Sequence, residues 1–278
     1  MITTAPPTPS LSPTATLTDD RHATRSPRDD LAAVPTVLRS EWIKLSSLRA
    51  NKAILGLTIG VDAVASWAVA TLVKDEVLTA SQVFIYPALL TAVFAAVTAI
   101  LLFSSEVQHG TLAATLTAQP ARWVIAVTKT MTATAAGLVL GAVGMAAGFA
   151  GAVAGGLDVG DTSAMASRTL WTLLYTSLAA VIGLGLAMIV RHSAGAISGL
   201  LVWWFVVENL IHAFAPARVG RFLPFDAGYR LLDVGSDLDS AETIAVALTR
   251  VQCALVFGGF AALTLIAGTV LLHRRDPN

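Results

Sequence analysis

The sequence predicts an all-α integral membrane protein with six transmembrane helices. Of its 278 residues, 55% are hydrophobic and 13% are charged, whereas soluble proteins carry about 25% charged residues. Some long stretches, such as residues 83–103, contain no charge at all. A membrane-spanning helix needs about 20 mostly apolar residues. The chain is therefore long enough for six spans joined by short polar connections.

Residues 1–35 are expected to form a disordered cytoplasmic arm. They are rich in Pro, Thr, Ser, Asp and Arg, and such a composition cannot bury enough apolar surface to fold. The apolar core of a secretory signal does not appear among them. Residues 36–278 are expected to form a single membrane domain.

Residues 36–52 predict an amphipathic interfacial helix that lies flat before the first span. Leu38, Trp42, Leu45 and Leu48 fall on one side of such a helix. Tryptophan and basic residues on a short amphipathic helix suit the headgroup layer, although a cytosolic extension of the first span is an alternative. The residues assigned to this helix are Glu41, Trp42, Lys44, Leu45 and Arg49, of which Glu41 and Lys44 are expected to point mostly away from the apolar side.

The predicted spans are residues 53–73, 83–103, 124–153, 169–190, 194–214 and 243–272. More of the loop lysines and arginines fall on the side that holds both termini and residues 104–123 than on the other side. Positive charge in short loops marks the cytoplasmic face. We therefore expect a multi-pass protein of the bacterial inner membrane with both termini and residues 104–123 in the cytoplasm.

The polar segment 104–123, SSEVQHGTLAATLTAQPARW, interrupts two long apolar runs. It is too long for a tight turn and too short for a domain. Glu106 and His109 are one helical turn apart, Gly110 permits a break, Thr111 suits a helix N-cap, and Pro120 would end that helix. A short helix at the membrane surface can enter a groove on another protein. The pattern is thus compatible with a docking element and also with a plain surface loop.

The third predicted span carries a stripe of glycines. Their spacing of three and four residues puts them on one face of a helix, where small residues let helix backbones approach closely in lipid. The glycines assigned to helix packing are Gly137, Gly141, Gly144, Gly148 and Gly151.

Besides Lys129 near the start of the third span, three charged residues fall within the predicted spans: Asp62, Glu208 and Arg250. A charge at the bilayer centre costs about 2.5–3.5 kcal/mol on insertion scales, so each should face a partner group or water. A pair between Glu208 and Arg250 is geometrically plausible. We expect the intramembrane charges to be few and scattered.

The sequence contains no phosphate-binding loop, no H-E-x-x-H, no G-x-S-x-G and no C-x-x-C motif. Its single cysteine, Cys253, cannot form an intrachain disulfide. We therefore expect no catalysis, and no cofactor or metal bound by this chain.

Four short motifs, taken in order, resemble the permease subunits of ATP-binding-cassette exporters of the second type, as found in actinobacteria. LRSEWIKLSSLR at 38–49 is similar to the opening of that family, and EVQHGTLAATLTAQPAR at 106–122 resembles its E-x-x-x-G-T followed by T-x-x-P-x-R. Glu208, followed by Leu223, Pro224 and Ala227, resembles its fifth-span glutamate and L-P-x-x-A pattern, and 274–276 resembles its terminal R-R-D.

The resemblance implies a six-span permease that works as a dimer with a second permease copy or a paralogue. A separate cassette ATPase would bind ATP and magnesium and would drive export through a cytosolic coupling segment between the second and third spans. The positions that would take part in coupling are Glu106, His109, Gly110, Thr111, Pro120 and Arg122. The substrate is not indicated.

Two other readings stay open at this point. An ion-coupled carrier could use Asp62, Glu208 and Arg250 without any ATPase. A membrane sensor or immunity protein could bind a ligand without moving it.

Overall fold

A computed structural model describes residues 27–73, 77–111, 115, 117, 121–232 and 244–274 of the chain. Within these ranges the protein is helical, without strands, and has six helices long and apolar enough to cross a membrane. The candidate spans are Arg49–Leu72 (α2), Ala80–Gln108 (α3, Ala80–Val83, and α4, Ala88–Gln108), Arg122–Ala154 (α6), Met165–Val190 (α7), Ser193–Phe214 (α8, Ser193–Val202; η2, Trp203–Val207; α9, Glu208–Phe214) and Arg250–Arg274 (α13).

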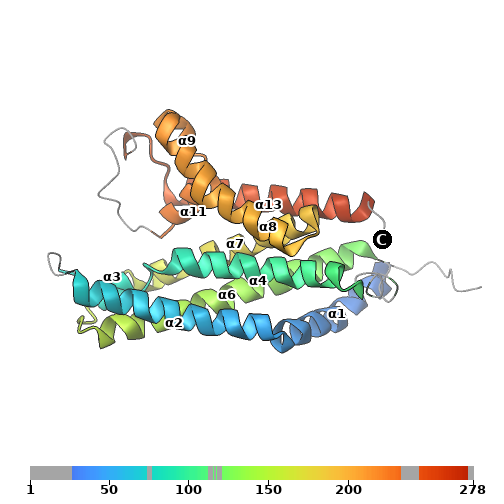
Figure 1. The fold of residues 1–278 in the computed structure, drawn as a ribbon, viewed down its shortest axis with the longest axis horizontal. Coiled ribbons are helices and arrows are strands. Elements are labelled where there is room, and N and C mark those ends of the chain that lie inside the picture. The colour runs from blue at the N-terminus through green and yellow to red at the C-terminus, as the bar shows by residue number, and fades with distance from the viewer. Residues whose placement is uncertain are drawn as a thin grey trace, which may run out of the picture.

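The helices form an elongated bundle in which α4 and α7 are the most enclosed spans (Figure 1). Each has 67% of its most apolar window buried, against 22% for α2, for the α8–α9 span and for α13. The exposed spans present large apolar side chains such as Trp67, Leu210 and Leu263. Faces of this kind suit contact with lipid, because apolar surface has no tendency to avoid hydrocarbon.

One end of the bundle, which we call the α1 end, gathers segments that are far apart in the sequence. Helix α1 (Pro27–Ser47) lies there, together with the C-terminal end of α13 (Figure 1). Leu48 is extended (φ −66°, ψ 124°) and separates α1 from α2. Leu45 of α1 packs with Leu102 and Ala136, so α1 crosses onto α4 and α6 instead of continuing α2.

Helix α1 differs from the sequence expectation in three ways. It ends at Ser47, so Arg49, expected in the interfacial helix, is instead the first residue of α2. It begins at Pro27, so residues 27–35, expected in the disordered arm, are helical. Proline at the first helical position and acidic residues in the first turn, here Asp29 and Asp30, both favour a helix start. Its buried side also differs: Glu41 is 1% exposed, whereas Trp42 of the predicted apolar strip is 46% exposed.

The glycine stripe of α6 faces two neighbouring helices. A Cβ on Gly137 would lie 2.7 Å from the backbone of Ser177 in α7, and one on Gly151 would overlap the carbonyl group of Ala63 in α2. Gly141 likewise faces Thr176, Gly144 faces Asp62, and Gly148 faces Ser66 together with the Phe84 carbonyl oxygen. The missing side chains therefore set the distances at which α2 and α7 pack on α6.

The opposite end of the bundle carries short helices. α10 (Ala217–Gly220) and α11 (Pro224–Arg230) follow α9 there. The Trp204 ring stacks on Phe225 of α11 with ring centroids 4.0 Å apart. The sixth span begins at Arg250, whereas the sequence suggested residue 243 and placed Arg250 inside the helix. Residue 243 itself lies outside the described ranges.

Candidate functional site

Four charged side chains meet at the α1 end, where α1 crosses α4 and α6. Lys129 Nζ of α6 lies 2.8 Å from Oε2 of Glu41 and 2.9 Å from Oε1 of Glu106. Lys44 Nζ of α1 lies 2.9 Å from Oε1 of Glu41 and 2.8 Å from Oε1 of Glu106. We call Glu41, Lys44, Glu106 and Lys129 the charge cluster. Its two acids and two bases join three helices.

The charge cluster is buried on one side and open on the other. The Lys129, Glu41 and Glu106 side chains are 0%, 1% and 7% exposed, whereas Lys44 is 39% exposed. A buried charge is stable only when it is paired and hydrogen-bonded. The cluster therefore holds α1 in one position, because moving α1 away would leave Lys129 without Glu41 and Glu106 without Lys44.

The electrostatics of α1 agree with this geometry. Burial acts to raise the pKa of the Glu41 carboxyl, but the charge of Lys129 and the hydrogen bonds from Lys129 and Lys44 hold that pKa below its ordinary value of 4.5. Burial acts to lower the pKa of the Lys44 ammonium, but its hydrogen bonds to Glu106 and Glu41 raise it above 10.5. Both groups are therefore charged near neutral pH.

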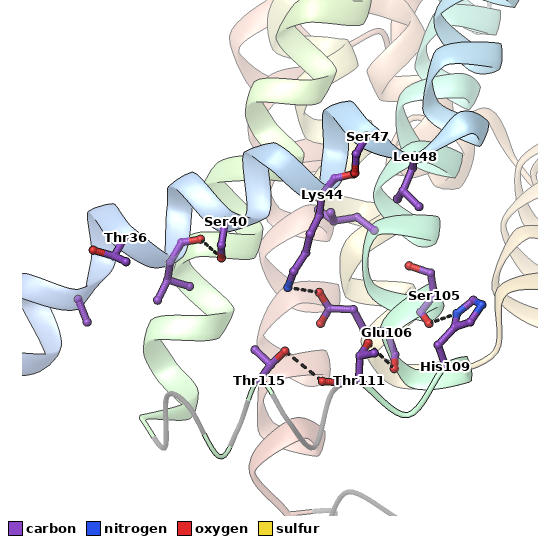
Figure 2. A pocket seen from close by; sticks show the side chains of 13 residues that line it. Thr36, Ser40, Lys44, Ser47, Leu48, Ser105, Glu106, His109, Thr111 and Thr115 are labelled. Atoms are coloured by element: carbon purple, nitrogen blue, oxygen red, sulfur yellow. Dashed lines mark hydrogen bonds and ion pairs between the residues drawn. The ribbon is translucent and has the colours of Figure 1, made fainter.

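A groove of about 950 Å³ opens beside the charge cluster, between α1 and the end of α4. Figure 2 shows Thr36, Ser40 and Lys44 along the α1 wall, and Glu106, His109 and Thr111 on the other. The α1 wall presents mostly small side chains, including Ala33. The groove thus offers room for side chains of another molecule next to partly buried charges.

The chain turns sharply where α4 ends. His109 Nδ1 lies 2.7 Å from the Ser105 carbonyl oxygen, and Thr111 Oγ1 donates to the Glu106 carbonyl oxygen at 3.3 Å. Gly110 has a φ of +68°, in the left-handed region where a Cβ is disfavoured. The glycine therefore lets the chain leave α4 directly below Glu106 and form the groove wall.

Two further contacts close the α1 end. Arg122, the first residue of α6, donates from a guanidinium nitrogen to the carbonyl oxygens of Leu272 (2.8 Å) and His273 (2.9 Å) at the end of α13. Gln108 donates from Nε2 to Ser193 Oγ at the start of α8 (3.0 Å). The segment 104–123 is thus tied through its two ends to α1, α8 and α13.

The structure brings together most of the residues that the sequence assigned to coupling. Glu106, His109, Gly110, Thr111 and Arg122 all lie at the α1 end, as do the α1 residues. Pro120 lies outside the described residues.

The three intramembrane residues do not form one site. Glu208 accepts hydrogen bonds from the backbone N–H groups of Phe225 (3.0 Å) and Asp226 (2.9 Å), and from Trp203 Nε1 (3.2 Å), so it caps α11 and does not pair with Arg250. Asp62 lies in the interior, where Thr91 donates a hydrogen bond to Oδ2 and Gly144 leaves room for the carboxylate.

Sequence reasoning missed the role of Lys129 and the burial of Glu41. The intramembrane charges looked scattered, and Glu41 was expected to point mostly away from the apolar side of its helix. A single lysine in a long apolar helix was a usable signal, because such a charge requires a buried partner. Its partners come from residues far away in the sequence, and only the crossing of α1 over the bundle brings them together.

A search against known protein-family models and a search of curated proteins each returned no match to this sequence.

Proposed function

We propose that this chain is the membrane subunit of an ATP-driven exporter and that a separate cassette ATPase drives it. The ATPase would dock at the α1 end, on α1 and residues 104–123. The observation that carries the proposal is the charge cluster beside the groove: it joins the surface open to a partner to α4 and α6, two long helices that run the length of the bundle.

The cluster would act as a rigid connection between the docking surface and the spans. A partner changes a conformational equilibrium only by binding its states differently. Force applied to α1 would pass through Glu41 to Lys129, and force applied at the turn after α4 would pass through Glu106 to the same lysine. The close packing of α6 against α2 and α7 would carry that movement into the bundle.

The direct test is reconstitution of the full chain in nanodiscs with a cassette ATPase from the same organism. We expect a stable complex whose ATP hydrolysis depends on the membrane subunit. Deleting Gly110 and Thr111 should leave membrane insertion intact and abolish the complex. Asp161→Asn, an exposed change at the opposite end of the bundle, is the control that should keep it. No complex with the wild-type chain would refute the proposal.

An ion-coupled carrier is the second candidate, and Asp62 is the observation that favours it. The residue is 1% exposed, and its Oδ1 accepts no hydrogen bond from the described part of the chain. Transport by the purified chain alone under a proton gradient, lost in Asp62→Asn, would favour this carrier over the ATP-driven exporter.

A further inference from the structure

We propose that the groove receives a basic side chain, an arginine or a lysine of the partner ATPase, and that this side chain donates a hydrogen bond to Oε2 of Glu106. The inference rests on the proposed function, since it names the chemistry by which the ATPase would be recognised at the same surface.

The two carboxylate oxygens of Glu106 have different surroundings. Oε1 accepts a hydrogen bond from Lys44 and forms an ion pair with Lys129. Oε2 is buried and accepts no hydrogen bond from any residue that the structure describes. Glu106 as a whole is only 6% exposed. A buried carboxylate oxygen without a donor is costly, and such atoms are rare in folded proteins. Among the described residues, one strong acceptor is therefore left unsatisfied at the wall of the groove.

Glu41 provides the internal comparison. It contacts the same two lysines, but each of its oxygens has one of them, Lys44 at Oε1 and Lys129 at Oε2. It is 1% exposed and does not line the groove. Both carboxylate oxygens of Glu41 therefore have a lysine partner within the charge cluster. The oxygen without one belongs to Glu106, which is the carboxylate of the cluster that borders the groove.

The neighbouring groups favour a cationic donor that reaches in from outside. Thr111 Oγ1 already donates to the Glu106 backbone carbonyl, and Lys44 Nζ already contacts two carboxylates. Ala33, Thr36 and Ser40 have small side chains, so the α1 side of the groove leaves space for a long side chain. A charged donor forms a stronger hydrogen bond to a carboxylate than a neutral one does.

The test compares the affinity of the ATPase for the full chain in nanodiscs between wild type, Glu106→Gln and Glu41→Gln, at low and high salt. Each glutamine variant replaces one of the two carboxylates that contact Lys44 and Lys129. We expect Glu106→Gln to weaken binding about 30-fold or more beyond the loss caused by Glu41→Gln. We also expect Glu106→Gln to reduce the salt dependence of binding. Asp161→Asn should bind as wild type.

A scan of the surface arginines and lysines of the ATPase to glutamine would then identify the donor. At one position, the loss of affinity caused by the ATPase substitution should be non-additive with the loss caused by Glu106→Gln. Hydrogen exchange of α1 in the free variants serves as the check on folding, and both glutamine variants should change it to a similar extent.

The outcomes are distinguishable. Equal losses for the two glutamine variants, with wild-type binding intact, would overturn the basic-donor inference and leave the proposed function standing. Tighter binding by Glu106→Gln would point to an acidic group in the groove and would overturn it as well. Failure of the wild-type chain to bind the ATPase would refute the proposed function, and this inference with it.

Discussion

Lys129 shows how one residue can determine the geometry of a membrane protein's surface. Its ammonium group is fully buried, yet it lies near the start of a span and contacts carboxylates from two other helices. Removing one member of a buried ion pair costs about 3–5 kcal/mol, because the other charge is left without compensation. The charge cluster therefore fixes α1 more by penalising its departure than by the net attraction of the pairs.

Lys129→Met is expected to lower the free energy of unfolding by about 3–5 kcal/mol, because two carboxylates would lose their buried partner. Unfolding of the detergent-solubilised chain would measure the loss. The matched control is Lys44→Met, which removes a lysine from the same carboxylates but from a side chain that is 39% exposed. Similar losses for the two variants would contradict a special role for the buried lysine.

The charge cluster also predicts a pH range for the docking of α1. The folded pKa of Glu41 lies below 4.5, so its contribution is complete above that pH and is lost as the pH falls through the folded value. The folded pKa of Lys44 lies above 10.5, so its contribution is complete below that pH and is lost as the pH rises through the folded value.

We therefore expect the position of α1 to be independent of pH between about 5 and 10. A distance probe between α1 and α6 would measure it, and Glu41→Gln should remove that residue's part of the acidic transition. A steep change in that distance near pH 7 would contradict the assignment.

At the scale of helices, the glycines of α6 determine how closely its neighbours pack. Its glycines let α2 and α7 approach until their backbones touch it, which gives van der Waals contact where lipid offers no hydrophobic drive. The rigidity of this contact is what would let a displacement of α6 reach the adjoining spans.

Gly151→Ala should destabilise the bundle by about 1–3 kcal/mol, because the new methyl group would overlap the backbone of Ala63, which cannot move aside as a side chain can. Gly60→Ala is the control, since a Cβ there meets nothing within 4 Å. Thermal unfolding of the two variants in one detergent compares them. A loss for Gly60→Ala as large as that for Gly151→Ala would argue against tight packing at the stripe.

The helix α11 depends on a cap from another helix. Glu208→Gln would replace one accepting oxygen by a donor that faces backbone N–H groups. The amide hydrogens of Phe225 and Asp226 should then exchange faster, by about tenfold or more for a loss of 1.4 kcal/mol or more. Asn209→Ala, at the next and exposed position, should leave their exchange unchanged, and unaltered exchange in Glu208→Gln would exclude the capping role.

At the scale of the whole molecule, the sequence predicted the spans better than their connections. Uncharged runs long enough to cross a bilayer identify six helices, and the part of the chain that the structure describes has six such helices in the same order. The run before Arg250 is as apolar as the helix after it, so composition alone could not separate the two and suggested a start at residue 243. The charge cluster could not be predicted from the sequence. The apolar strip on α1 indicated which side of the helix would be buried, and it did not indicate that Glu41 would turn inward to pair with the buried Lys129.

The orientation in the membrane can be tested in the full chain. In a background without the buried native Cys253, His109→Cys should react with a membrane-impermeant reagent only from the cytoplasmic side. Ser163→Cys, in an exposed connection at the opposite end of the bundle, should react only from outside. The reverse pattern would place the groove outside the cell and exclude docking by a cytoplasmic ATPase.

The contact from Arg122 to the end of α13 has a consequence for biosynthesis. The ribosome makes the charge cluster's three helices before α7 and α13, so Glu41, Glu106 and Lys129 can meet before those spans exist. Arg122 must wait for the carbonyl groups of Leu272 and His273, which follow it by 150 and 151 residues. A chain that stops short of α13 would therefore leave the membrane insertion machinery without the contact between the start of α6 and the end of α13.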